Sequence, residues 1–393
     1  MDIFLGILLA FAVFFLVVLI HELGHFVVAR LSGMKVLEFG FGIPPKIKKL
    51  FTDKKGTNFT LNLLPIGGFV RIFGEDPTSK DAFAKGAFLS RPLTSRLAVL
   101  VAGVVMNFLL AWVIFTVIFM TGTKPLSVLP IDVGGPTHSY LLPSLEEAKD
   151  SGLIEGKGIV FNPLTGSIAE QSGIQKSSKV IAVNHVPIDT VDTLIHSIQT
   201  EKNLQIELKS SSGGFYTVSL QPKDGKIGVQ IYEDLQVNAN FQEKKFAFLD
   251  ATTLAAKETY ASSILTFKLL GKTFSALLFP KEPAERESAK EMLSGPIGVG
   301  NAFVKMVDLQ VSWTIIWIFV AMISVNLGVL NILPFPALDG GRMVTTTLYS
   351  IISQFTHSKT LYLKIEQWIN GIGFLLLMLL MLYVAFLDIG RFF

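Results

Sequence analysis

The chain has 393 residues, a formal net charge of +3 and no cysteine. Half of its residues are hydrophobic and only 17% are charged, and the mean hydropathy is +0.52. A water-soluble fold of this size needs more charge on its surface, so the composition indicates a protein of the lipid bilayer. The small net charge argues against a nucleic-acid partner. The lack of cysteine excludes disulfides, thiolate metal ligands and a cysteine nucleophile.

Four apolar segments reach the roughly 20 residues that a helix needs to span a bilayer. The first lacks the basic start and the small-residue cleavage site of a signal peptide, so we expect a retained helix. Four spans place both ends of the chain on the same side of the membrane. The segments are residues 3–30, 97–122, 311–333 and 367–387.

Lys and Arg residues predict the orientation of these spans. Loop 31–96 is rich in both, and short basic loops stay in the cytoplasm. Loop 342–366, which carries Arg342, Lys359 and Lys364, falls on the same side. The long segment between the second and third spans then lies outside.

A β-hairpin is predicted within the first loop. Residues 57–73 read TNFTLNLLPIGGFVRIF, in which two β-rich runs flank a turn at Pro65-Ile66-Gly67-Gly68. The run is very apolar for a solvated hairpin. A surface hairpin stays open as an alternative, but we favour one that dips into the membrane against the helices, where irregular backbone must be buried in protein.

The outer segment divides into two parts by its patterning. Residues 159–222 alternate strand-like runs with a helical stretch, which predicts a small α+β module. Residues 246–278 read as a helix with apolar side chains at three- and four-residue spacing, suited to the membrane surface. Residues 280–290 alternate acid and base, as in a solvated linker.

The candidate chemistry begins with the motif H-E-x-x-H at the end of the first span, His21-Glu22-Leu23-Gly24-His25. Histidines four apart on a helix project from one face, about 6 Å from each other, so both imidazoles can bind one Zn²⁺. Glu22 is offset around the axis and can reach a water at the metal without ligating it. Two histidines and a glutamate cost several kcal/mol in an apolar span unless paired or metal-bound. A polar helix end at the interface is the alternative.

A zinc hydrolase needs a third protein ligand and an open fourth position. Asp339 is the best candidate, because Pro334 and Pro336 break the third span before it. The Gly340-Gly341 pair then permits a turn that aims the carboxylate back into the bundle. By topology the first and third spans run the same way, so His21, His25 and Asp339 reach the same face. A capping residue is the alternative for Asp339.

These motifs resemble those of the site-2 protease family, in particular its bacterial RseP-type branch of intramembrane metalloproteases. The resemblance covers all four spans and rests on several motifs in the right order. They are HELGH, IGGFVRIFGE in the basic loop, LSGPIGV at 293–299 and ISVNLGVLNILPFPALDGG at 323–341.

The resemblance implies roles for individual residues. His21, His25 and Asp339 would bind zinc, with Glu22 as the catalytic base. Asn331 with the nearby Pro334, and the turn at Gly67-Gly68, would hold the substrate, which would be a single-span membrane protein such as an anti-sigma factor or a signal-peptide remnant, usually trimmed first by another protease. Arg342 stands where some members have histidine, so that position is not a metal ligand.

Some alternatives stay open from the residues themselves. Asn331 serves either the substrate backbone or the carbonyls freed by the prolines of its own span. For Gly103 and Asn107 in the second span, helix packing is favoured over support of the site. Rival functions are another membrane H-E-x-x-H peptidase with a glutamate third ligand, and a non-enzymatic membrane scaffold. The oligomeric state is not predicted.

The predicted fold is therefore a polytopic α-helical membrane protein with four transmembrane helices, a membrane-associated β-hairpin and an extracytoplasmic α+β domain. The resemblance implies that this domain is PDZ-like and that the membrane is a bacterial inner membrane. The active site would lie toward the cytoplasmic side. In chain order, the expected segments are the first transmembrane helix (1–30), the loop with the hairpin (31–96), the second transmembrane helix (97–122), an extracytoplasmic extension (123–158), the PDZ-like domain (159–235), membrane-surface helices with a linker (236–310), the third transmembrane segment (311–341), a second cytoplasmic-side loop (342–366) and the fourth transmembrane helix (367–393).

Overall fold

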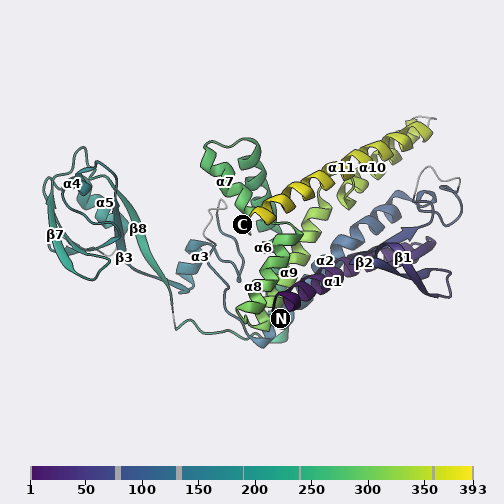
Figure 1. Ribbon diagram of the computed structural model, residues 1–393, viewed down its shortest axis with the longest axis horizontal. Helices are drawn as coiled ribbons and strands as arrows, with labels where there is room; N and C mark the ends of the chain where they lie inside the picture. Colours follow the sequence, from purple (N-terminus) through teal and green to yellow (C-terminus); the bar gives the residue numbers. More distant parts are fainter. Residues whose placement is uncertain are drawn as a thin grey trace. The chain divides into compact units, whose positions relative to one another are not determined.

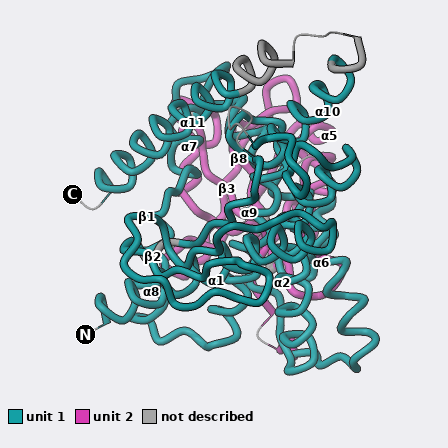
Figure 2. Tube along the Cα trace, turned by 90° about the vertical axis from the view of Figure 1, so that its right-hand side faces the viewer, with its two compact units in different colours: residues 1–127, 131–142, 243–393 teal, residues 128–130, 143–242 magenta. Residues whose placement is uncertain are grey.

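The computed structural model describes residues 2–75, 81–129, 135–188, 190–238, 240–355 and 359–391. The chain forms two compact units (Figure 2). Unit 1 comprises residues 1–127, 131–142 and 243–393, and unit 2 comprises residues 128–130 and 143–242. The candidate chemistry lies in unit 1.

Four helices of unit 1 are long and apolar enough to cross a membrane. They carry apolar side chains all around, and none of the four contains a proline, so nothing interrupts their backbone hydrogen bonds. Their positions agree with the four predicted spans to within a few residues. They are α1 (Asp2–Leu31), α2 (Leu93–Thr121), α9 (Trp313–Ile332) and α11 (Lys359–Gly390), of which Gln367–Gly390 is the apolar part.

Helix α2 packs against both α1 and α9 (Figure 1). Small residues permit close approach: a Cβ on Gly24 of α1 would clash with the carbonyl of Ala102, and one on Gly328 of α9 would lie 2.9 Å from the Phe108 ring. The buried core between the helices is apolar. Its members include Val17, Ala111, Phe115, Phe119, Ile318, Val325 and Val329.

Helix α6 (Phe248–Leu278) runs along α2 and α9. Trp112 of α2 donates a hydrogen bond from Nε1 to the Thr252 carbonyl (3.0 Å), and Thr266 donates to Asn326 of α9 (2.7 Å). Its buried face is made of small residues such as Ala251 and Ala255, which allow close packing. The larger apolar side chains of α6, such as Phe248 and Tyr260, are exposed, and the place of this helix at the membrane surface stays a prediction. Helices α7 (Pro283–Met292) and α8 (Pro296–Asp308) follow, and α8 packs on α1.

The basic loop forms a sheet from strands β1 (Val36–Thr52) and β2 (Asn58–Ile72), but not by the predicted pairing. Glu38 to Phe41 pair with Asn58 to Leu61 and also with Gly68 to Arg71. The two runs expected to form a hairpin with each other therefore flank β1 instead. Beyond Pro44-Pro45, which lack N–H donors, β1 pairs again through Lys46–Thr52 with Asn58–Asn62.

Gly68–Ile72 consequently forms an edge of this sheet. Its pairing with β1 occupies one side of the stretch, while β2 also contacts α1. Gly67 adopts a positive φ of 73°, and a Cβ there would lie 2.7 Å from Val18 of α1. Glycine thus lets the edge stretch approach the helix that carries the H-E-x-x-H motif.

The stretch between the third and fourth spans also differs from expectation. Residues 342–366 were predicted to be a loop, but α10 (Asp339–Phe355) occupies much of the stretch. The apolar side chains of α10 recur at helical spacing, which favours a helix over a loop. The short helix η1 (Phe88–Ser90) precedes α2.

Unit 2 is an α+β module, as the patterning predicts. Its six-stranded sheet has the order β7-β6-β4-β3-β8, with β5 paired to β4, and these neighbouring strands run antiparallel. Helix α5 covers a core that includes Ile159, Phe161, Leu194, Ile206 and Leu208. The elements are α3 (Leu145–Asp150), β3 (Ile154–Pro163), α4 (Ile168–Gln171), β4 (Ser178–Val183), β5 (Val186–Pro187), α5 (Val191–Thr200), β6 (Leu204–Lys209), β7 (Phe215–Leu220) and β8 (Val229–Val237).

Candidate metal centre

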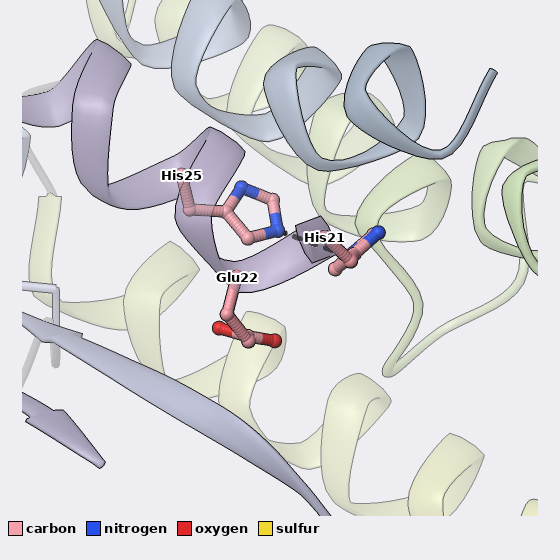
Figure 3. Close-up of side chains that lie close together, drawn as sticks. All are labelled: His21, Glu22 and His25. Atoms are coloured by element: carbon pink, nitrogen blue, oxygen red, sulfur yellow. Dashed lines mark hydrogen bonds between the residues drawn. The ribbon is translucent and has the colours of Figure 1, made fainter. Parts of the chain in front are cut away.

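Two imidazoles face each other on α1. His21 and His25 lie one helical turn apart, and their Nε2 atoms are 3.1 Å from each other. Figure 3 shows the two rings meeting on one side of the helix, with their centroids 4.7 Å apart. Both residues are buried, with exposed fractions of 5% and 9%. Such a pair of buried nitrogens is a ready donor set for a divalent cation.

Asp339 supplies a carboxylate to the same place. Helix α9 ends at Ile332, and α10 begins at Asp339 itself. Asp339 Oδ2 lies 3.0 Å from His21 Nε2 and 3.3 Å from His25 Nε2. The structure therefore brings the three predicted ligands together.

The glycines after Asp339 act differently from the expected turn. Gly340 and Gly341 belong to the first turn of α10. A Cβ on Gly340 would clash with the Ile332 carbonyl, and one on Gly341 with the Phe335 carbonyl. Glycine is needed here because the start of α10 lies directly against the broken end of the third span.

The spacing of the three donor atoms fits a tetrahedral zinc ion. Zinc bonds of about 2.0–2.1 Å at tetrahedral angles place neighbouring donors about 3.4 Å apart. The observed separations of 3.0, 3.1 and 3.3 Å are close to that value. Two imidazoles and one carboxylate also leave the fourth position open, as in hydrolytic zinc sites.

Helix α2 contacts the Nδ1 atoms of both imidazoles. His25 Nδ1 donates to the Val99 carbonyl at 2.7 Å, and the Asn107 amide lies 3.2 Å from His21 Nδ1. Such contacts fix the ring and its tautomer, leaving Nε2 for a metal. Asn107 Oδ1 is buried and has no hydrogen-bond partner within the described ranges. With the amide turned over, that oxygen would accept the His21 Nδ1–H.

Gly103 of α2 makes room for the two rings. A Cβ at this position would lie 2.6 Å from His21 Cε1 and from His25 Nε2. Gly103 and Asn107 thus both contact the histidines, in addition to packing the helices. Helical packing alone is what the sequence predicts for these two residues, because the rotation of one span against another is not visible in a single sequence.

The side chain of Glu22 projects from α1 in a different direction from the two imidazole rings (Figure 3). Its carboxylate is within 4.8 Å of the ligand atoms of His21 and His25. Glu22 and Val70 of the edge stretch line the same cavity. Glu22 therefore faces the sheet, in the position that a proton acceptor beside a metal needs.

A cavity of about 330 Å³ opens onto this cluster. Asn331 of α9 lines it, as the sequence predicts for a substrate contact. Gly68 is not among the described lining residues, although a Cβ there would lie 3.8 Å from Glu22 Cγ. Among the described lining residues, neither Gly67 nor Pro334 occurs. The lining includes Val18, Phe69, Val70, Ile72, Glu75, Leu327 and Arg342.

The chain thus combines four membrane-length helices with a candidate metal centre, in which Asp339 lies beside the buried His21 and His25. The family model described as Peptidase family M50 matches residues 9–380. The chain therefore belongs to this family, the site-2 proteases.

Relatives over the whole length support the same assignment. A candidate zinc metalloprotease of Clostridium perfringens is 31% identical over 388 residues, covering 98% of each chain. One of Clostridium acetobutylicum is 29% identical over 395 residues, again with 98% of each covered. The zinc metalloprotease RasP of Geobacillus kaustophilus is 27% identical over 433 residues, with 97% of each covered. The chain is accordingly a membrane zinc metalloprotease.

Proposed function

We propose that the protein is an intramembrane zinc endopeptidase that hydrolyses transmembrane segments of single-span membrane proteins. The main support for this proposal is that His21, His25 and Asp339 converge, with their donor atoms within 3.3 Å of one another. These three residues would hold the zinc ion. When bound, zinc lowers the pKa of a water ligand and polarises the scissile carbonyl.

Glu22 is the proposed catalytic base. Its carboxylate lies within 4.8 Å of the ligand atoms of His21 and His25. Its carboxylate would accept a proton from the attacking water and return it to the leaving nitrogen of the peptide. The side chain of Glu22 is half-buried, which would limit competition from bulk water for this proton.

The substrate would bind as an extended strand. A helical segment hides its peptide bonds in its own hydrogen bonds, so it must unwind before hydrolysis. Phe69, Val70 and Ile72 of the edge stretch line the catalytic cavity, and a sheet edge can replace the lost backbone bonds by strand addition. Asn331 faces the same cavity and would hydrogen-bond the extended backbone.

Unit 2 is the proposed substrate filter. Its antiparallel sheet with short helices supports a PDZ-like domain, which we place outside the cytoplasm of a bacterial inner membrane, with the catalytic cavity toward the cytoplasmic side. Such a module would exclude substrates with bulky outer domains until another protease has trimmed them. Deletion of residues 159–222 should then permit cleavage of an untrimmed substrate. Unchanged selectivity would contradict the filter role.

The test of the proposed function compares the wild-type protein with the Glu22→Gln variant, each reconstituted with a single-span model substrate. The wild type should cut within the span. Glu22→Gln should lose about two to four orders of magnitude in rate while keeping its zinc. Glu291→Gln, an exposed change on α7, is the matched control and should cut normally. Full cleavage by Glu22→Gln would refute the mechanism, and a wild type that never cuts would favour a scaffold.

A further inference from the structure

An ion pair joins the metal-bearing helix to the edge of the sheet. Arg342 lies in the first turn of α10, three residues after Asp339. Its Nη2 atom is 2.6 Å from Glu75 Oε1. The two side chains are about one third and one quarter exposed, so the pair is less screened by water than a fully exposed one.

Glu75 is tied to the edge stretch as well. Its second carboxylate oxygen, Oε2, accepts a hydrogen bond from the Ile72 backbone N–H at 3.2 Å. Its own N–H donates to the Ile72 carbonyl at 3.4 Å. One carboxylate therefore links the last residue of β2 to a guanidinium carried by the helix of Asp339.

The pair also forms part of the catalytic cavity wall. Glu75 and Arg342 both line the 330 Å³ cavity beside the histidines. Both also line a neighbouring cavity of about 70 Å³, whose other walls include Phe88 and Tyr349. The Glu75–Arg342 ion pair therefore lies at the end of β2, the strand along which the substrate is proposed to bind.

We propose that Glu75 and Arg342 are positioning residues that fix the register of the substrate strand against the metal centre. This inference rests on the proposed function. Successive residues of a strand are about 3.3 Å apart, so a small shift of the edge stretch presents a different peptide bond. Displacements near 1 Å already cost about 100-fold in rate. A direct link between β2 and α10 holds the strand and the metal ligand at a constant separation.

The test measures which bonds are cut and how much zinc is bound. Arg342→Gln and Glu75→Gln would be compared with the wild type on one single-span substrate, with products identified by mass spectrometry. The wild type should cut at one principal bond. Each variant should cut at neighbouring bonds too, with kcat/KM lowered about 10- to 100-fold and zinc content unchanged. Cutting at the same bond and rate, or loss of zinc, would overturn the positioning role.

The double variant separates a shared role from two independent ones. If the two residues act through one ion pair, Glu75→Gln with Arg342→Gln should be no worse than either single change. Multiplied losses would overturn the paired role. Arg342→Lys keeps the charge but not the planar guanidinium, and it should recover most of the single-bond cleavage. Scattered cleavage equal to that of Arg342→Gln would contradict an ionic link.

Arg30→Gln is the matched control. Arg30 also joins a metal-bearing helix to the sheet, through its ion pair with Asp53, but it does not line the catalytic cavity. This variant should keep the single cleavage position. Scattered cleavage in Arg30→Gln as well would show that any loosening of the sheet has this effect, and would overturn the specific role of Glu75 and Arg342. A wild type without cleavage would refute the proposed function instead.

Discussion

Asp339 Oδ2 lies 3.0 Å from His21 Nε2, although the two residues come from opposite ends of the chain. Helix α2 makes this meeting possible, because it packs against both α1 and α9. The break after Ile332 then turns the chain so that α10 starts at the histidine pair. The metal centre is thus a product of tertiary packing around one helical motif.

The space in front of Gly103 gives the first prediction. Gly103→Ala places a methyl group 2.6 Å from both imidazoles, so the rings must move apart and zinc affinity should fall at least about 10-fold. Overpacking should also cost about 1–3 kcal/mol of stability. Zinc content after dialysis against a weak chelator measures the effect. Gly271→Ala in α6, where a Cβ meets open space, should retain its zinc, and equal retention in Gly103→Ala would contradict the prediction.

The Asn107 amide gives the second prediction. Removing it by Asn107→Ala leaves His21 Nδ1 without its partner in α2, and such supporting contacts are typically worth 10- to 100-fold in metal affinity. The zinc dissociation constant measures the loss by competition with a chromophoric chelator. Asn326→Ala is a matched control, because Asn326 is also an asparagine within a span but bonds Thr266 of α6. Similar affinities in both variants would rule out a supporting role for Asn107.

Glu258 of α6 gives a prediction on pH. It is 1% exposed and accepts hydrogen bonds from Ser139 Oγ (2.6 Å) and the Tyr140 N–H (2.7 Å). Burial raises the pKa of this carboxyl above its ordinary value, more than those donors lower it. A raised pKa means that the folded protein holds this proton more tightly than the unfolded chain, so the contribution to stability declines as pH rises above about 4.5.

The measurement is the thermal midpoint of detergent-solubilised protein across that pH range. The side chain at position 258 of the Glu258→Gln variant cannot ionise. The thermal midpoint of this variant should therefore rise relative to that of the wild type as pH increases through the raised pKa of Glu258. The exposed change Glu291→Gln should show no such trend. A constant difference between wild type and Glu258→Gln would argue against ionisation of this group in the folded state.

Removal of the metal gives the fourth prediction. A strong chelator should abolish cleavage, and stoichiometric Zn²⁺ should restore it, because the donor set is tied in place by α2 rather than created by the ion. The core of unit 2 contains none of the three proposed ligands, so its folding should be unaffected. Loss of the near-ultraviolet circular dichroism signal of unit 2 when the metal is removed would contradict the prediction that this unit folds independently of the metal.

The three proposed zinc ligands could be predicted from the sequence because each is marked by a local sequence pattern. His21 and His25 lie on one face of any helix because they are four apart. Asp339 follows two prolines that must break a span. The residues of α2 that contact the histidines are harder to predict from the sequence. Gly103 and Asn107 are ordinary small and polar residues of an apolar segment, and only the rotation of α2 about its axis decides that they face the histidines.

The sheet shows a second limit. Asn58 to Leu63 alternate clearly, but the stretch that pairs with them, Glu38 to Phe41, contains Gly40 and is followed by Gly42 and Pro44-Pro45. These residues weaken the local β signal. The turn-like Gly67-Gly68 then favoured a simple hairpin. A strand inserted between the two runs is a non-local arrangement, which local patterning does not reveal.

The most direct test of the central claim is zinc K-edge X-ray absorption on the purified protein, with wild type and Asp339→Ala compared at equal zinc loading. The wild type should show two imidazole nitrogens and carboxylate oxygen at about 2.0–2.2 Å, with no sulfur. Asp339→Ala should lose the carboxylate scatterer and most of its zinc affinity. An unchanged spectrum and affinity in Asp339→Ala would show that a different residue completes the site.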